Sequence, residues 1–278
     1  MVRVTGFGQT GPYKMRPGFG TIAEAFSGFS NVKGEKNGPP TLPNFGLADG
    51  IAASYGTFAT MFALYYRDVQ GGNGQFIDLS IYEPIFQLLG PQPMAYDQLG
   101  IIQERMGNRS LNNSPRNTYQ TLDKHWVAIS TNSPSIVKRV LTLCGGENVA
   151  NDPRFQTPAG RVEFIDEVDG VVANWISQHN LNDVLEKFEE VEAAVGPVYN
   201  IAQIFDDPQY IARNDIINLN DEDLGKIKMT AGFPFMSETP PEIRHAGPSK
   251  GKHNTEIYCK ELKLKVRELE LLKEKGVI

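Results

Sequence analysis

The sequence predicts an α/β protein in which a large domain with parallel strands is joined to a smaller α+β domain. Strands and helices alternate over the first ninety residues, a pattern typical of parallel sheets. Pro91, Pro93 and Gly100 then interrupt the pattern, and residues 107–115 contain almost no apolar side chain. A second set of strands and helices follows. We therefore assign residues 1–90 to part of the large domain, 91–115 to a linker, 116–200 to the small domain, and 201–278 to a linker and a C-terminal return to the large domain.

Composition narrows the classes of function. The chain has 278 residues, of which 40% are hydrophobic, enough to fill proper cores. Its net charge of −6, with no clustered basic face, argues against nucleic acid as a partner. No apolar run approaches the roughly 18 residues of a membrane span, so we expect no membrane contact. Cys144 and Cys259 are far apart and the four histidines are scattered, so we expect a cytoplasmic protein with no metal site.

The first elements form a strand, a turn and a short helix. Val2–Thr5 has the character of a strand, and it begins almost at the first methionine, which suggests that an N-terminal portion is missing. Residues 6–12 contain three glycines and a proline, so their backbone can approach a ligand closely. Residues 21–29 are expected to form a short helix.

Asp49 is the first candidate for chemistry. The apolar run Phe45–Ala48 predicts a buried strand that leads into a helix over 51–66, which is apolar nearly all round and is therefore expected to be buried. Asp49 stands at the junction and is followed by Gly50. Two interpretations are open: a helix N-cap, or a carboxylate nucleophile that the helix dipole keeps ionised.

The remaining elements follow from periodicity. Residues 75–80 alternate as a strand, and a helix is expected over 81–89. In the small domain we expect strands at 126–130 and 195–199. We also expect helices at 135–144, 162–178 and 181–191. Gly145 and Gly146 are expected to end the helix at 135–144. Strand-like pieces at 216–219 and 226–230 precede an amphipathic helical stretch at 254–275.

Taken together, seven motifs resemble the class III CoA transferases (CaiB/BaiF type), a family that includes formyl-CoA transferase and carnitine CoA transferase and has the α-methylacyl-CoA racemases as relatives. The resemblance runs the whole length of the chain. The motifs are TGFGQTGPY at 5–13, RPGF at 16–19, LADG at 47–50, GNGQFID at 72–78, the run from GNR at 107–109 through Ser114, Pro115 and Tyr119, DPQ at 207–209 with Arg213, and GKHNTEI at 251–257 with the final GVI.

The resemblance implies a fold and a reaction. The large domain would be an incomplete Rossmann-like domain, because the family's N-terminal nucleotide-binding segment is not in this sequence, and the family fold is an interlocked dimer. Asp49 aligns with the family's nucleophile, which forms an acyl anhydride and then an aspartyl-CoA thioester. The backbone N–H of Gly50 is a candidate donor to the oxyanion. No cofactor is implied, since the coenzyme A thioester is itself a substrate.

The resemblance also implies binding residues. Pro17, Gly18, Phe19 and Gly20 would contact CoA near its thiol, together with Gln9. The loop that contains Asn108, Arg109, Asn113 and Ser114 would close over the substrate. This loop is a run of glycines in formyl-CoA transferase, whereas Asn112, Asn113 and Ser114 are bulkier here, and Gly20 stands where many members carry an acidic residue. Both departures argue against oxalate or formate as substrate.

Three functions are open to a chain with these motifs. The racemase histidine and glutamate align with Phe19 and Gln120, neither of which can move a proton, so we favour a transferase. Its partners would be an acyl-CoA and a carboxylic acid, and its assembly a homodimer or a complex with a chain that supplies the missing segment. An α-methylacyl-CoA racemase-type enzyme and a non-catalytic fragment or subunit are the alternatives.

Overall fold

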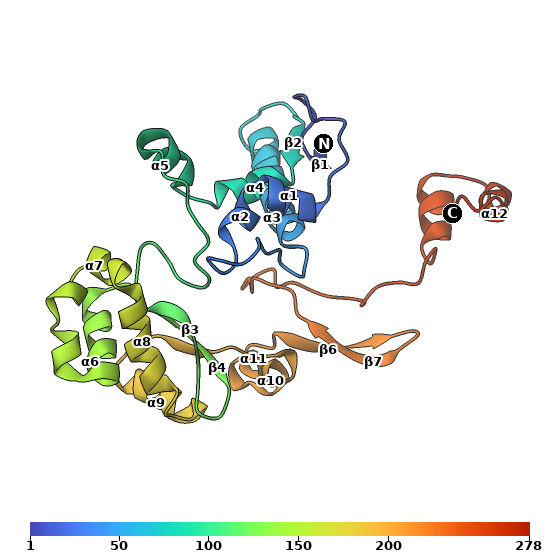
Figure 1. Cartoon of the computed structure of the whole chain (residues 1–278). Coiled ribbons are helices and arrows are strands. Elements are labelled where there is room, and N and C mark those ends of the chain that lie inside the picture. The colour runs from blue at the N-terminus through green and yellow to red at the C-terminus, as the bar shows by residue number, and fades with distance from the viewer. The chain divides into compact units, whose positions relative to one another are not determined.

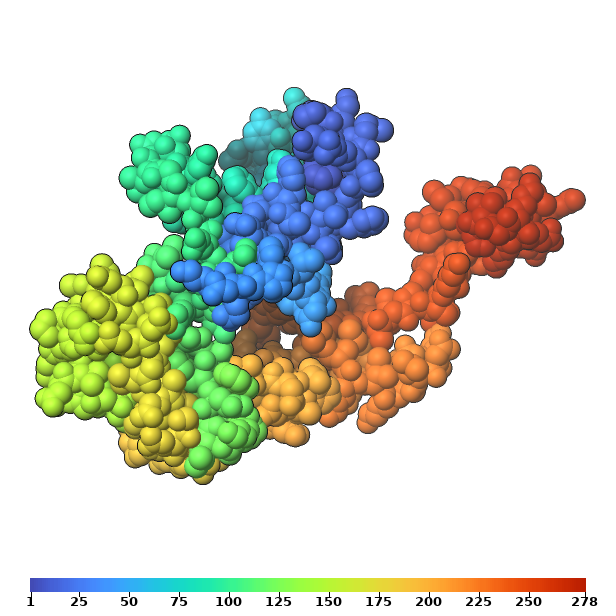
Figure 2. Space-filling view, viewed as in Figure 1, coloured from blue at the N-terminus to red at the C-terminus, as the bar shows by residue number.

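The computed structural model describes all 278 residues, and they divide into two compact units, Met1–Val198 and Tyr199–Ile278. Figure 1 labels elements of both units where there is room, and Figure 2 shows the surface in the same colours. No helix is both long enough and apolar enough to cross a membrane.

The first unit begins with a two-stranded parallel sheet. β1 (Val2–Thr5) pairs with β2 (Ile77–Ser80), with Val2 opposite Ile77 and Thr5 opposite Ser80. This confirms the predicted α/β class with parallel strands. Five helices belong to this part of the unit: α1 (Gly20–Phe26), α2 (Phe29–Val32), α3 (Leu47–Asp68), α4 (Tyr82–Gln87) and α5 (Gln92–Leu99). Of these, α3 and α4 contact the sheet. Ala23, Ala48 and Ile85 form the small core where α1, α3 and α4 meet.

Helix α5 lies inside the segment that the sequence predicts as a linker. Pro91 is its N-cap and Pro93 is in its first turn, where proline removes no helical hydrogen bond. Gly100 ends the helix with a φ of +66°. These residues therefore mark the two ends of a helix, and the prediction that they interrupt regular structure was wrong for 92–99.

Helix α3 is buried on one narrow stripe only. Ala48, Ala52 and Gly56 are buried, and a Cβ at Gly56 would lie 3.1 Å from the Leu79 side chain of β2. Phe58 and Phe62 are 59% and 58% exposed. The prediction that this helix is buried was therefore wrong for most of its surface, because its neighbours α1, α4, β1 and β2 cover only the stripe of small residues.

The small α+β region of the first unit is an antiparallel sheet covered by helices. Its strands are in the order β3 (Arg116–Gln120), β4 (Trp126–Ser130) and β5 (Val195–Pro197). Along β4, Val127 and Ile129 are buried while Ala128 is exposed, so one face of the sheet carries the core. The helices are α6 (Pro134–Ala150), η1 (Pro153–Phe155), α7 (Pro158–Glu163), α8 (Ile165–Ile176) and α9 (Leu181–Glu190).

Two predicted helix limits were wrong in this region. Gly146, at φ +77°, kinks the chain, but helix α6 resumes and continues to Ala150. The helix expected over 162–178 is instead two helices, because Phe164 leaves helical geometry with φ −101° and ψ +35° between α7 and α8.

Burial makes one of the two cysteines unreactive. Cys144 packs against the core cluster that contains Val140, and this burial raises the pKa of its thiol to about 12. At pH 8 about 10⁻⁴ of such a thiol is thiolate, the reactive form. We therefore expect Ellman's reagent to label Cys259 in the native protein and to label Cys144 only after unfolding. Equal labelling of both thiols in the native protein would contradict this packing.

The second unit consists of short helices and one hairpin. It contains α10 (Ile201–Asp206), α11 (Pro208–Ala212), the antiparallel hairpin of β6 (Ile216–Asp221) and β7 (Gly225–Thr230), the π-helical turn η2 (Thr255–Glu261) and α12 (Val266–Glu274). Leu269 is its one buried hydrophobic residue.

Candidate active site at the start of helix α3

Asp49 is the third residue of α3, and its carboxylate is exposed and accepts no hydrogen bond. The N-cap of α3 is Gly46, which has no side chain to cap with, so the N-cap interpretation of Asp49 was wrong. The predicted strand over Phe45–Ala48 was also wrong, because the helix begins at Leu47. A carboxylate in the first turn of a 22-residue helix lies where the helix dipole favours negative charge.

Glu24 performs the capping role that the sequence offered to Asp49. The Ala48 N–H donates to Glu24 Oε1 at 3.2 Å, and Glu24 is only 2% exposed. Gly20, Ala23 and Glu24 are the buried residues of α1 and lie on one helical face. Sequence reasoning missed Glu24. The available signal was its position, four residues after Gly20 and one after Ala23, which places an acidic side chain on the same helical face as small residues.

Gly20 is the one predicted binding residue that the structure brings against Asp49. A Cβ at position 20 would lie 2.9 Å from Asp49 Cγ and closer still to Oδ2. Glycine at this position therefore leaves the space that the carboxylate occupies. The N–H of Gly50 donates to the carbonyl of Gly46 at 3.0 Å, so a role as oxyanion donor requires this helical hydrogen bond to be shared or given up.

The glycine-rich turn is held against the segment that precedes α1. A Cβ at Gly6 would lie 2.8 Å from Gly18 Cα, so the two backbones touch without side chains between them. The Gln9 N–H donates to both carboxylate oxygens of Asp78, at 3.0 and 3.1 Å. Asp78 thus shapes the turn, a role that the sequence did not reveal. Pro17 and Phe19 are exposed at the surface of the same segment.

The loop from Asn108 to Ser114 is fastened to the small α+β region. Arg109 pairs with Asp169 at 2.8 Å and with Asp166 at 2.7 Å. The Asn113 amide donates to the Thr131 carbonyl at 2.9 Å. Ser114 is fully buried, its hydroxyl has no hydrogen-bond partner, and its carbonyl accepts from Arg161 Nε at 2.8 Å. Asn108 is exposed and donates to Thr118. None of these groups hydrogen-bonds to Asp49.

Asp169 accepts several of the hydrogen bonds that hold this loop and strand β3 to helix α8. It is 6% exposed, and besides Arg109 it accepts from the Asn117 amide at 2.9 Å and the Tyr119 hydroxyl at 2.7 Å. Burial, and then the Asp169 charge, raise the pKa of Tyr119 well above its usual range, so the phenol stays a donor.

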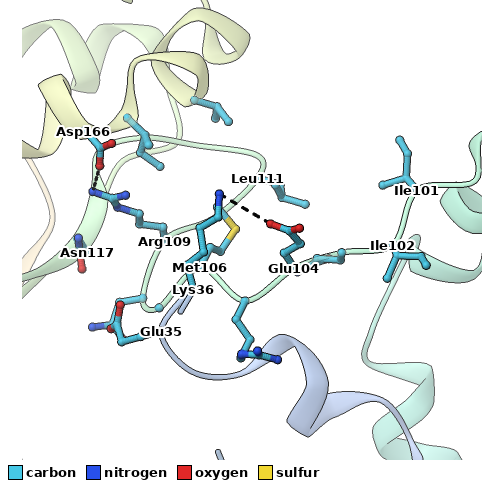
Figure 3. A pocket seen from close by; sticks show the side chains of 16 residues that line it. Glu35, Lys36, Ile101, Ile102, Glu104, Met106, Arg109, Leu111, Asn117 and Asp166 are labelled. Carbon is cyan, nitrogen blue, oxygen red and sulfur yellow. Dashed lines mark ion pairs between the residues drawn. The ribbon is translucent and has the colours of Figure 1, made fainter. Parts of the chain in front are cut away.

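A cavity of about 660 Å³ lies beside this loop (Figure 3). The cavity is lined by apolar side chains such as Ile101 and Ile102 and by two ion pairs. The ion pairs are Arg109 with Asp166 and Lys36 with Glu104. Asp49 does not line it. No three His, Cys, Asp or Glu side chains come together to hold a metal ion.

Comparisons with known proteins agree with this fold. The profile of CoA-transferase family III matches residues 1–254. The succinyl-CoA–D-citramalate CoA-transferase of Chloroflexus aurantiacus is 37% identical over 278 residues, which are 100% of this chain and 69% of that protein. The alpha subunit of its succinyl-CoA–L-malate CoA-transferase is 32% identical over 279 residues, covering 100% of this chain and 65% of the subunit.

Solved structures carry the same fold. The crystal structure of a CAIB/BAIF family protein from Brucella suis superimposes with a TM-score of 0.75 at 25% identity, covering 93% of this chain and 67% of that one. The chain thus spans about two thirds of the length of the relatives it matches. Since the profile and the alignment to the citramalate enzyme both extend over nearly the whole sequence, the chain belongs to CoA-transferase family III.

Proposed function

We propose that this chain carries the nucleophile of a CoA transferase, Asp49, and moves CoA from an acyl-CoA to a free carboxylic acid. The observation that carries the proposal is the Asp49 carboxylate itself: exposed, free of hydrogen bonds, and in the first turn of α3. An unpaired carboxylate keeps its lone pairs for attack on a carbonyl carbon.

The proposed reaction has four exchanges. Asp49 attacks the thioester carbon, the C–S bond breaks, and an aspartyl anhydride and CoA thiolate result. The thiolate then attacks the Asp49 carbonyl carbon, which releases the donor acid and leaves an aspartyl-CoA thioester. The acceptor carboxylate attacks this thioester and again frees the thiolate. Attack of the thiolate on the acceptor's carbonyl carbon yields the new acyl-CoA and restores Asp49.

Succinyl-CoA is the proposed donor, and a dicarboxylic acid the proposed acceptor. Relatives of 32–37% identity are named for succinyl-CoA with D-citramalate or L-malate, and one of 30% identity for succinate and glutarate. Relatives named for formyl-CoA and oxalate are 26% identical. The bulky loop around Asn113, in place of a glycine run, also supports a substrate other than oxalate.

The proposed assembly is a homodimer or a complex with a second chain. Two relatives of 32% and 34% identity are named as the alpha and beta subunits of one succinyl-CoA–L-malate CoA-transferase. Native mass spectrometry of the purified chain tests the homodimer directly.

A trapping experiment tests the function. The chain is incubated with succinyl-CoA, hydroxylamine is added, and peptide mass spectrometry locates any hydroxamate. We expect a hydroxamate on Asp49, since hydroxylamine cleaves both the anhydride and the thioester at the aspartyl carbonyl. A folded sample that forms no adduct at Asp49 contradicts the proposal for this chain.

Gly20→Ala is expected to lower activity without unfolding the protein. The new Cβ would displace the Asp49 carboxylate, and a misplacement of about 1 Å costs up to about 100-fold in rate. The free energy of unfolding should change by less than about 1 kcal/mol, because alanine suits a helix better than glycine does. Kinetics and urea unfolding are measured on Gly20→Ala and on Gly170→Ala, a control in α8 where the Cβ meets open space. Full activity in Gly20→Ala would show that the carboxylate has no need of this space.

A further inference from the structure

We infer that Glu24 is a positioning residue for the Asp49 nucleophile, an inference that rests on the proposed function. Its carboxylate occupies the end of α3 and holds the backbone of the residue before Asp49. Glu24 touches no reacting atom in this arrangement, so its effect passes through Ala48.

The start of α3 needs a hydrogen-bond acceptor from outside the helix. The N–H groups of the first turn of a helix have no partner within the helix and need one from elsewhere. In α3 the N-cap is Gly46, which has no side chain to offer, and Asp49 makes no such bond. Ala48 is fully buried, so water does not serve its N–H, and Glu24 Oε1 at 3.2 Å is its partner.

Glu24 in turn needs a donor, because its carboxylate is buried. A carboxylate that is 2% exposed is expensive to keep unless it is hydrogen-bonded, and a helix N-terminus is a favourable place for its charge. The bond to Ala48 is the one hydrogen bond that its carboxylate accepts. Carboxylate and helix end therefore satisfy each other, across 24 residues of sequence.

The same face of α1 also lies against Asp49. Gly20 and Glu24 are one helical turn apart on the same face of α1. Gly20 makes room for the Asp49 carboxylate, and Glu24 binds the adjacent backbone. The face thus fixes the first turn of α3 at two neighbouring points. Because Glu24 supplies the cap, the Asp49 carboxylate is left free for attack.

The test compares Glu24→Leu, which removes the acceptor, with Glu24→Gln, which keeps an oxygen at the same reach. Glu83→Leu is the matched control, since Glu83 accepts from the Ser80 N–H at 3.3 Å near the start of another helix, α4. With succinyl-CoA we expect Glu24→Leu to form the Asp49 adduct about 10–100-fold more slowly, with KM changed less than about twofold. Glu24→Gln should restore most of the rate, and Glu83→Leu should match the wild type. Should Glu24→Leu fail to fold, Glu24→Asp, which withdraws the acceptor by one methylene, replaces it with the same expected loss.

Amide hydrogen exchange without substrate separates this inference from the proposed function. We expect the Ala48 N–H to exchange at least about 10-fold faster in Glu24→Leu than in the wild type and to be unchanged in Glu83→Leu. Unchanged exchange at Ala48, or unchanged adduct formation in Glu24→Leu, overturns the inference. Equal losses in Glu24→Gln and Glu24→Leu overturn the acceptor role. If the wild type itself forms no adduct, the proposed function fails and the exchange result alone decides whether Glu24 holds Ala48.

Discussion

Replacing Asp49 with alanine is expected to abolish CoA transfer, with a loss of about 10⁴-fold or more in kcat. The reason is that both proposed covalent intermediates are formed on this one carboxylate, so no partial route survives its removal. Alanine is preferred to asparagine because an asparagine before Gly50 would deamidate back to aspartate. The measurement is the rate of succinyl transfer at saturating succinyl-CoA, followed by chromatography of the CoA esters.

Asp183 provides the matched control for this substitution. Like Asp49, it is an exposed third residue of a helix, in this case α9, which begins at Leu181. Removing either carboxylate loses the same small favourable interaction with the helix dipole, about 0.3–1 kcal/mol. Asp183→Ala should therefore keep full activity with the same slight change in stability. Comparable rates in Asp49→Ala and Asp183→Ala would exclude Asp49 as the nucleophile.

Replacing Asp169 with alanine is expected to lower the free energy of unfolding by about 3–5 kcal/mol. The substitution leaves Arg109, Asn117 and Tyr119 without the carboxylate to which all three donate. Tyr119 is buried, and its hydroxyl would then be unpaired in an apolar core. Urea unfolding, followed by circular dichroism with linear extrapolation, measures the change.

Asp166 shows whether burial is the source of that effect. It pairs with the same Arg109 at 2.7 Å, but its side chain is 86% exposed. An exposed ion pair contributes about 0–1 kcal/mol, so Asp166→Ala should change stability little. If Asp166→Ala and Asp169→Ala destabilise equally, the charge of Arg109, rather than the buried hydrogen bonds, is what matters.

The elements predicted well were those in which local pattern determines the exposed face. Strand β4 was predicted with its observed limits, because Val127 and Ile129 alternate with side chains on the other face. The parallel relation of β1 and β2 followed from the helices between them. Errors came where one residue type can either interrupt a helix or mark its end. Pro91 and Gly100 were predicted to be interruptions, whereas they are the N-cap and C-cap of α5.

By itself the sequence determined the α/β class, the order of the motifs and therefore the family, since these depend on residues close together along the chain. Only the tertiary structure decided what Asp49 is free to do. The N–H of its neighbour Ala48 donates to Glu24, 24 residues away in the sequence. In the same way, Arg109 donates to Asp169, 60 residues away. Such contacts form when separate helices pack and their buried polar groups take the nearest partner, and the spacing of residues within either helix does not specify that partner.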